Sequence, residues 1–230
     1  MKQVIAAHGW AGDASVWSFW ERCFTDKGWQ WQSSDRGYGG QDAVEPSWSE
    51  QSRKRLLLCH SLGPHLLPAR TLETADAIVL LGGFTSFVPA GPAGRRQAIA
   101  LRGMEDRLGT AKEADMLQKF LERCASPLPA SALPPPPLLS PLSDAGRQRL
   151  QQDLKLLRDC NDLPVGWPKQ ARTLVIQGQE DAIVSRESQE LLLERLQEQA
   201  TTLIQLPGHG HALITPAVLK QVLTWLEEGA

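Results

Sequence analysis

Residues 57–63 read Leu-Leu-Cys-His-Ser-Leu-Gly, an apolar run that ends abruptly on a serine. A buried strand that turns sharply through Ser-x-Gly into a helix lifts the serine hydroxyl out of the sheet and aims the next backbone N–H at the same point. The stretch therefore predicts a strand, a turn and a helix, with Ser61 as a nucleophile. Of the neighbouring histidines, His60 is expected to line the pocket wall and His65 the helix surface.

Strand-length apolar runs alternate with helical patterns on both sides of this serine. We expect strands at 3–7, 29–33, 55–60, 77–81, 172–177 and 202–206, and helices at 15–24, 186–198 and 216–227. Pro68 is expected to kink or end the helix that follows Ser61. Largely apolar strands that alternate with helices indicate an α/β fold with a parallel sheet.

The middle of the chain has no convincing strand. We expect helices at 95–108, 112–124 and 147–158, with the proline run 134–137 as a stiff connector between them. Such a run can also be a recognition peptide, which is the less favoured interpretation. The expected organisation is a first core part at residues 1–84, a helical lid insertion at 85–162 and a second core part at 163–230.

Composition favours a globular domain and argues against several partners. The 230 residues are 42% hydrophobic with a net charge of −2, whereas nucleic acids and anionic membranes usually require a basic surface. No apolar run approaches the ~20 residues of a membrane span, and the run at residues 4–7 is too short for a signal-peptide core. We expect a soluble, cytoplasmic monomer with reduced cysteines, no metal and no cofactor.

Candidates for the other catalytic groups follow Ser61 in the order nucleophile, acid, histidine, as in the serine-elbow fold. Asp181 comes just after the expected strand 172–177, and His211 comes after 202–206. Both therefore lie at the carboxyl edge of the sheet, where open α/β sheets place their sites. The histidine takes the serine proton, and the carboxylate fixes the tautomer of the histidine. We predict a triad of Ser61, Asp181 and His211.

An oxyanion that forms on acyl attack needs two preorganised N–H donors. One is expected from the backbone of Leu62, directly after the nucleophile. The other is expected from Trp10, in the loop 8–12 after the first strand, where the His-Gly pair lets the backbone turn inward. An ordinary strand-to-helix turn is the alternative interpretation of that loop.

These residues resemble the α/β-hydrolase fold family, from its third strand onwards. The resemblance implies a mainly parallel sheet of about six strands, with the first two strands missing, and a helical lid insertion. More narrowly, the chain is similar to the carboxylesterases of biotin synthesis, which remove the methyl group from pimeloyl-acyl-carrier-protein methyl ester. The narrower resemblance rests on residues 8–10, 100–104, 150–159 and 211–212.

The resemblance implies a serine carboxylesterase that acts through an acyl-enzyme on a small acyl ester. It also implies lid or substrate contacts from Ile99, Leu101 and Arg102. Other reactions of the same fold, namely general ester hydrolysis, carbon–carbon bond hydrolysis and acyl transfer, stay open. A noncatalytic binding protein is the third hypothesis.

An acyl-carrier protein is acidic and would need a basic surface near the lid. Between residues 95 and 112 the chain has five basic and two acidic residues, which predicts docking through Arg95, Arg96 and Arg107 and a mainly kinetic benefit. A solvated helix face explains the same pattern equally well.

Two choices and three departures accompany the resemblance. Asp181 is preferred over Glu180 because the residues after it resemble the family's usual turn, and His211 over His209 because an apolar segment follows it. The departures are Cys59 in place of a glycine two residues before the nucleophile, Pro64 in place of a glycine after Gly63, and Leu213 in place of a proline.

Overall fold

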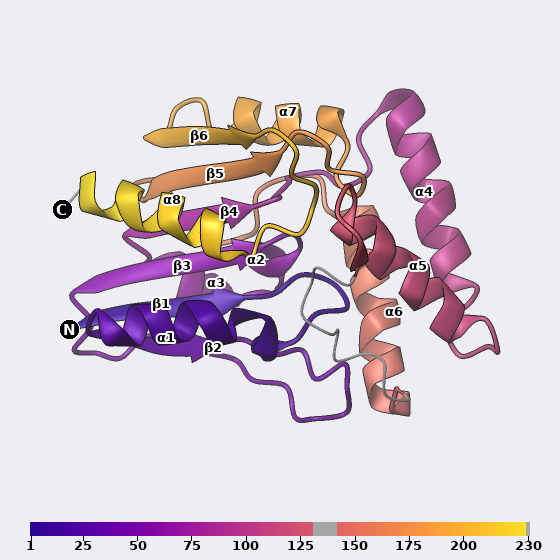
Figure 1. The fold of residues 1–230 in the computed structure, drawn as a ribbon, viewed down its shortest axis with the longest axis horizontal. Coiled ribbons are helices and arrows are strands. Elements are labelled where there is room, and N and C mark those ends of the chain that lie inside the picture. The colour runs from indigo at the N-terminus through magenta and orange to yellow at the C-terminus, as the bar shows by residue number, and fades with distance from the viewer. Residues whose placement is uncertain (131–141, 229–230) are drawn as a thin grey trace.

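The computed structural model describes residues 1–130 and 142–228. In these residues six strands form one sheet in the order β2-β1-β3-β4-β5-β6 (Figure 1). The strands are β1 (Lys2–Ala7), β2 (Trp29–Ser33), β3 (Lys54–His60), β4 (Ala77–Leu81), β5 (Arg172–Gly178) and β6 (Thr201–Leu206). Every neighbouring pair is parallel. The predicted strands and the parallel sheet are confirmed.

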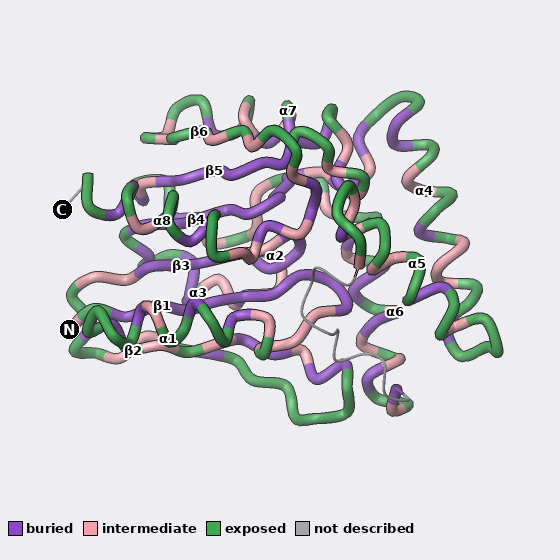
Figure 2. Tube along the Cα trace, viewed as in Figure 1, coloured by how far each residue is buried: buried purple, intermediate pink, exposed green. Residues whose placement is uncertain are grey.

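Burial along the strands follows their place in the sheet. β4 is buried at all five positions, as expected of an inner strand covered on both faces. The edge strand β2 alternates between buried or half-buried and exposed positions, and β6 has no fully buried position. Figure 2 shows the same contrast between the sheet centre and its edges. Because all strands run the same way, their carboxyl ends meet at one edge, which is where the candidate site lies.

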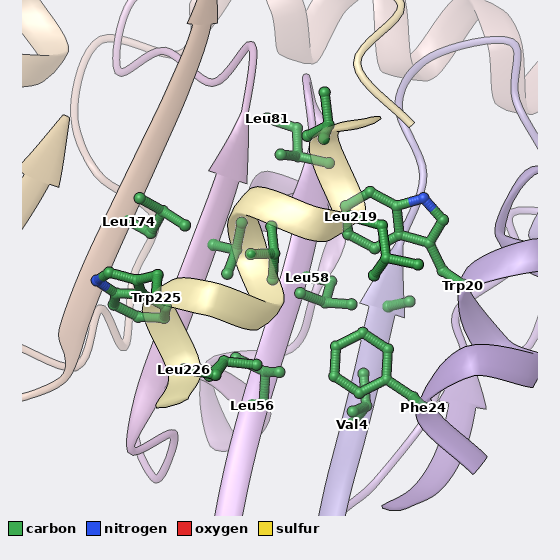
Figure 3. Packing of buried hydrophobic residues seen from close by; sticks show 14 of the residues in the cluster. Val4, Trp20, Phe24, Leu56, Leu58, Leu81, Leu174, Leu219, Trp225 and Leu226 are labelled. Atoms are coloured by element: carbon green, nitrogen blue, oxygen red, sulfur yellow. The ribbon is translucent and has the colours of Figure 1, made fainter. Parts of the chain in front are cut away.

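Helices cover both faces of the sheet. They are the 3-10 helix η1 (Ala14–Trp17), α1 (Ser18–Asp26), α2 (Gly63–Leu66), α3 (Ala69–Leu72), α4 (Gly91–Glu105), α5 (Glu113–Ala125), α6 (Asp144–Asp159), α7 (Arg186–Arg195) and α8 (Pro216–Glu228). On one face α1 and α8 pack Trp20, Phe24 and Trp225 against alternate residues of β1, β3 and β5 (Figure 3). On the other face Leu72 and Leu192, from α3 and α7, pack against the remaining alternate residues.

The helices α4, α5 and α6 lie together beyond the carboxyl edge of the sheet (Figure 1). Their apolar sides share a cluster with residues of the core, among them Trp10 and Leu62. We call these three helices the lid. The proline run 134–137 lies outside the described residues.

Several boundaries differ from the sequence prediction. The helix expected at 15–24 is divided into η1 and α1, and Asp13 caps the start of η1 by accepting a hydrogen bond from the Ser15 N–H. α4 begins at Gly91, four residues before the predicted start, with a proline in its first turn. α2 ends at Leu66, two residues before Pro68, as predicted.

Candidate active site

Ser61 stands at the end of β3 in a backbone conformation that side chains rarely adopt. Its φ is +54°, and its N–H donates to the Leu81 carbonyl at 2.9 Å, which holds the turn in place. Residues other than glycine adopt this left-handed conformation only where the surrounding structure holds them in it. The helix after the turn approaches β1 closely, since a Cβ on Gly63 would lie 2.5 Å from the Ala7 carbonyl oxygen. The serine hydroxyl is thereby raised above the sheet edge.

The structure accommodates the two unusual residues beside Ser61, Cys59 and Pro64. Cys59 is fully buried in the core between β3 and the helices behind it, and burial raises the pKa of its thiol, so the group is an inert apolar side chain. Pro64 lies in the first turn of α2, where the helix needs no N–H. Neither residue prevents the turn.

Asp181 and His211 meet at the same edge. Asp181 follows β5 and His211 follows β6, and the His211 Nδ1 donates to Asp181 Oδ2 at 2.8 Å, with both side chains almost fully buried. The other carboxylate oxygen accepts the N–H groups of Ile183 and Val184 at 2.8 and 2.9 Å. Burial would raise the pKa of Asp181, but His211 and these hydrogen bonds outweigh it and lower that pKa. An ionised Asp181 fixes His211 with its Nε2 available as a base.

Four other titratable residues near the site do not line the cavity, namely His60, His65, Glu180 and His209. Glu180 is exposed and contributes only a backbone N–H, which donates to His209, while the His209 ring bonds the Pro207 carbonyl. The prediction that His65 lies on the helix surface is wrong, because its ring is half-buried, bonds the Phe84 carbonyl at 3.0 Å and stacks on Phe84. His60 is not among the residues that line the cavity; its ring lies beside His211 instead.

Gly82 packs against both Asp181 and His211, and the sequence analysis did not predict it. It follows β4 with a φ of +58°, and a Cβ there would lie 3.1 Å from His211 Nδ1 and 3.6 Å from Asp181 Oδ2. Only glycine combines this backbone conformation with room for the imidazole and carboxylate. The Gly-Gly pair after the strand 77–81 was the available signal.

The two expected oxyanion donors flank Ser61. The loop after β1 lies against the turn, since a Cβ on Gly9 would lie 2.8 Å from Ser61 Cβ. Within the described part of the chain, the backbone N–H groups of Trp10 and Leu62 donate to no other group. The Trp10 indole is already used, because its Nε1 donates to the Leu150 carbonyl of α6 at 3.0 Å. Of the two N–H groups of Trp10, the backbone one is therefore the one that makes no hydrogen bond within the described residues and could bind an oxyanion.

A cavity of about 790 Å³ opens beside Ser61 under the lid. Trp10 and Asp181 also line it, and so does Leu101 of the three residues expected as lid contacts. Ile99 and Arg102 are exposed and do not line the cavity, because they lie on the outer side of α4. Of the residues expected for docking, Arg96 and Arg107 line the cavity, whereas Arg95 does not.

The lid is hydrogen-bonded to both loops that hold the Asp–His pair. Arg123 of α5 donates to the Ala182 carbonyl at 3.1 Å, and Gln97 of α4 donates to the Ile183 carbonyl at 3.3 Å. The Ala212 N–H donates to the Cys124 carbonyl at 3.1 Å. The lid helices therefore support the loops as well as cover the cavity.

In residues 1–130 and 142–228, no cluster of three or more His, Cys, Asp or Glu side chains could hold a metal ion. No helix in the same residues is both long and apolar enough to cross a membrane.

Models of protein families and curated proteins give no match to this chain. Solved structures do resemble it. An esterase from Exiguobacterium antarcticum is 20% identical, with a TM-score of 0.75 over 99% of this chain and 92% of that one. A thermophilic esterase from Thermogutta terrifontis is 15% identical, with a TM-score of 0.63 over 99% and 90% of the two chains. An esterase from Rhodococcus sp. ECU1013 is 19% identical, with a TM-score of 0.60 over 98% and 90%.

At these identities the likeness is one of fold. The six-stranded sheet with helices on both faces matches these proteins along nearly the whole chain. The chain therefore has the α/β-hydrolase fold, and the predicted fold class is confirmed.

Proposed function

We propose that this protein is a serine hydrolase that cleaves carboxylic esters through an acyl-enzyme. One observation carries the proposal. Ser61 stands at a strained turn with a φ of +54° at the end of β3, at the same sheet edge as a buried His211–Asp181 pair joined at 2.8 Å. Two unused backbone N–H groups, of Leu62 and Trp10, flank that turn.

The proposed reaction has two halves. Ser61 Oγ attacks the ester carbonyl carbon while His211 Nε2 takes its proton, and the Leu62 and Trp10 N–H groups bind the oxyanion. The tetrahedral intermediate collapses, and His211 returns the proton to the departing alcohol. Water then attacks the acyl-enzyme with His211 as the base, which releases the acid and restores the Ser61 hydroxyl. Asp181 stabilises the imidazolium in both halves.

The decisive experiment removes the nucleophile. Ser61→Ala should lower kcat on a short p-nitrophenyl ester by about 10³-fold or more and should abolish labelling by a fluorophosphonate probe. Substantial activity in Ser61→Ala would overturn the proposal. A wild-type protein that neither hydrolyses esters nor takes up the probe would instead favour the noncatalytic binding protein.

The cavity supports an ester with an apolar acyl chain and an anionic group. Its lining includes buried apolar side chains such as Leu101 and Met116, together with exposed cationic side chains and one exposed carboxylate, Asp115, which pairs with Lys119. Three of the cationic side chains, Arg96, Arg107 and Lys112, have no carboxylate partner among the described residues. Unpaired cations at a rim attract an anionic substrate and mainly speed its association.

We propose pimeloyl-acyl-carrier-protein methyl ester as the specific substrate, with the carrier docking through Arg95, Arg96 and Arg107. Arg96→Glu should lower kcat/KM about tenfold, or about 1.4 kcal/mol, for a small carboxylate-bearing ester and for the carrier-linked ester, and should spare a neutral ester. Arg95, which lies outside the cavity, should affect only the carrier-linked ester when changed to Glu. Equal loss on all three esters would argue against both roles.

The biotin assignment has its own test. Expression of this protein should restore growth of a biotin auxotroph that lacks its own pimeloyl ester esterase, and the Ser61→Ala variant should not. Failure to restore growth, by an expressed protein that hydrolyses small esters, would remove the pathway substrate and leave the esterase proposal standing.

A further inference from the structure

His60 is an imidazole next to the nucleophile that the proposed reaction does not use. It ends β3 and directly precedes Ser61. Its ring lies beside the ring of His211, with centroids 4.9 Å apart and planes inclined at 47°. Its Nε2 is 2.9 Å from the backbone carbonyl oxygen of His211.

The hydrogen bond fixes the protonation of His60. A carbonyl oxygen can only accept, so His60 Nε2 carries the proton and donates it. Burial, with a further contribution from the neighbouring His211, lowers the pKa of His60 to about 3, although Asp181 acts in the opposite sense and His8 adds slightly to the lowering. The ring is therefore neutral at the pH of catalysis and places no charge against the imidazolium that forms on His211.

His211 is held at three points. Its ring bonds Asp181, its carbonyl accepts from His60, and the N–H of the next residue, Ala212, donates to the Cys124 carbonyl of α5. These contacts come from the loop after β5, from the end of β3 and from α5 of the lid, respectively. Among the described residues, only the His60 bond joins the backbone of His211 directly to β3, the strand that precedes Ser61.

We propose that His60 is a positioning residue, which sets the approach of His211 to Ser61 through its hydrogen bond to the His211 carbonyl. The inference rests on the proposed function, because the distance that it sets matters only if Ser61 and His211 react. His211 is held by its hydrogen bonds to Asp181 and His60, so the place of its ring relative to Ser61 depends on these two contacts. Misplacement of a catalytic group by about 1 Å can cost about 10²-fold in rate.

Two substitutions at residue 60 separate the hydrogen bond from the volume of the ring. His60→Phe keeps a ring but removes the donor, and His60→Gln places an amide N–H where His60 Nε2 stands. For a neutral p-nitrophenyl ester we expect His60→Phe to lower kcat about 10- to 100-fold with KM changed less than about twofold. His60→Gln should restore kcat to within about threefold of the wild type.

His65 supplies the matched control. It also donates Nε2–H to a carbonyl, that of Phe84 at 3.0 Å, from a position five residues after His60, but it does not line the cavity. His65→Phe should leave kcat within about twofold of the wild type. A kcat loss in His65→Phe equal to that in His60→Phe would identify general disturbance of the turn and overturn the positioning role.

A spectroscopic measurement makes the test independent of turnover. In the Ser61→Ala background, the low-field proton resonance of His211 Nδ1–H should shift or broaden on His60→Phe and recover on His60→Gln. An unchanged resonance and an unchanged kcat in His60→Phe would each overturn the proposal, and so would a His60→Gln variant as impaired as His60→Phe. If His60→Phe does not fold, His60→Met replaces it. Activity in Ser61→Ala, in contrast, would overturn the proposed function.

Discussion

At the scale of single residues, the candidate site depends on small side chains as much as on reactive ones. Gly9 and Gly82 stand where a Cβ would lie 2.8 Å from Ser61 Cβ and 3.1 Å from His211 Nδ1 respectively. Distances below 3.0 Å force the neighbouring group to move, and those just above it require a small shift. Gly9 therefore sets how closely the loop 8–12 approaches Ser61, and Gly82 sets how closely β4 approaches the Asp181–His211 pair.

Gly82→Ala should lower kcat for a neutral ester about tenfold or more, because the new methyl group pushes His211 away from Asp181 and the φ of +58° resists a side chain. The measurement is steady-state kinetics with thermal unfolding on the same samples. Gly28→Ala is the control, since Gly28 has a φ of +77° but open space around it. It should lose about 1 kcal/mol of stability and keep its kcat. An equal kcat in the two variants would contradict the argument.

At the same scale, sequence reasoning predicted Asp181 and His211, which the structure brings together, but not Gly82, which packs against both side chains. Asp181 and His211 follow strands whose apolar patterns are visible in the sequence. Gly82 also follows such a strand, but the need for glycine arises from a ring and a carboxylate that come from other strands. The contacts of His60 and His65 were missed for a similar reason, because both rings bond carbonyl groups distant in sequence.

At the scale of elements, α6 is the helix that joins the lid to the core. Its Asp153 is buried and accepts two hydrogen bonds from Arg36, at 2.9 and 2.7 Å, and one from the Tyr38 hydroxyl at 2.6 Å. On its other sides α6 bonds α5 through Arg147 and Glu113 at 2.6 Å. The loop after β2 thus anchors the lid through one carboxylate.

Asp153→Ala should lower the free energy of unfolding by about 2–4 kcal/mol, since it leaves the Arg36 guanidinium and Tyr38 hydroxyl without their partner. Urea unfolding measures the change. Asp159→Ala is the control on the same helix, because its ion pair with Arg158 is exposed and such pairs contribute about 0–1 kcal/mol. A loss in Asp153→Ala no larger than that in Asp159→Ala would show that the Asp153 carboxylate does not anchor α6.

The elements themselves were largely predictable, and their mutual anchoring was not. Helical periodicity located α4, α5 and α6 to within a few residues, since an apolar stripe reveals that a helix packs against something. It does not reveal against what. Residues 35–40 have the glycine-rich, polar composition typical of a loop, yet they include the fully buried Tyr38 and Arg36, the partner of Asp153.

At the scale of the whole molecule, three histidines are packed in the folded chain in their neutral form. Burial is the largest cause in each case, and it lowers the pKa of His8, His60 and His65 from 6.5. Below pH ~6.5 the unfolded chain therefore binds protons that the folded chain does not. When the pKa of a histidine is lower in the folded chain, protonation at low pH favours the unfolded chain. The free energy of unfolding is therefore larger at high pH and decreases as the pH falls.

We expect the free energy of unfolding to fall between pH 6.5 and 5, by up to about 1.4 kcal/mol per pH unit for each buried imidazole. Urea unfolding at several pH values measures the slope. His60→Gln should reduce it, because that substitution removes one imidazole whose pKa burial lowers. A stability that stays constant over this range would contradict neutral burial of the three rings. The lowered pKa of Asp181 keeps this carboxylate ionised over the whole range, so it does not contribute to the slope.

The sequence by itself determined the strands, the parallel sheet and the place of each reactive group along it. This is so because local periodicity and the turn after each strand are properties of short segments. Only the tertiary structure decided that Ile99 and Arg102 face away from the cavity, that Gly82 makes room for the Asp–His pair, and that His60 contacts the backbone of His211. Each of these depends on distances between segments far apart in the chain, which packing of the whole molecule sets and no local pattern encodes.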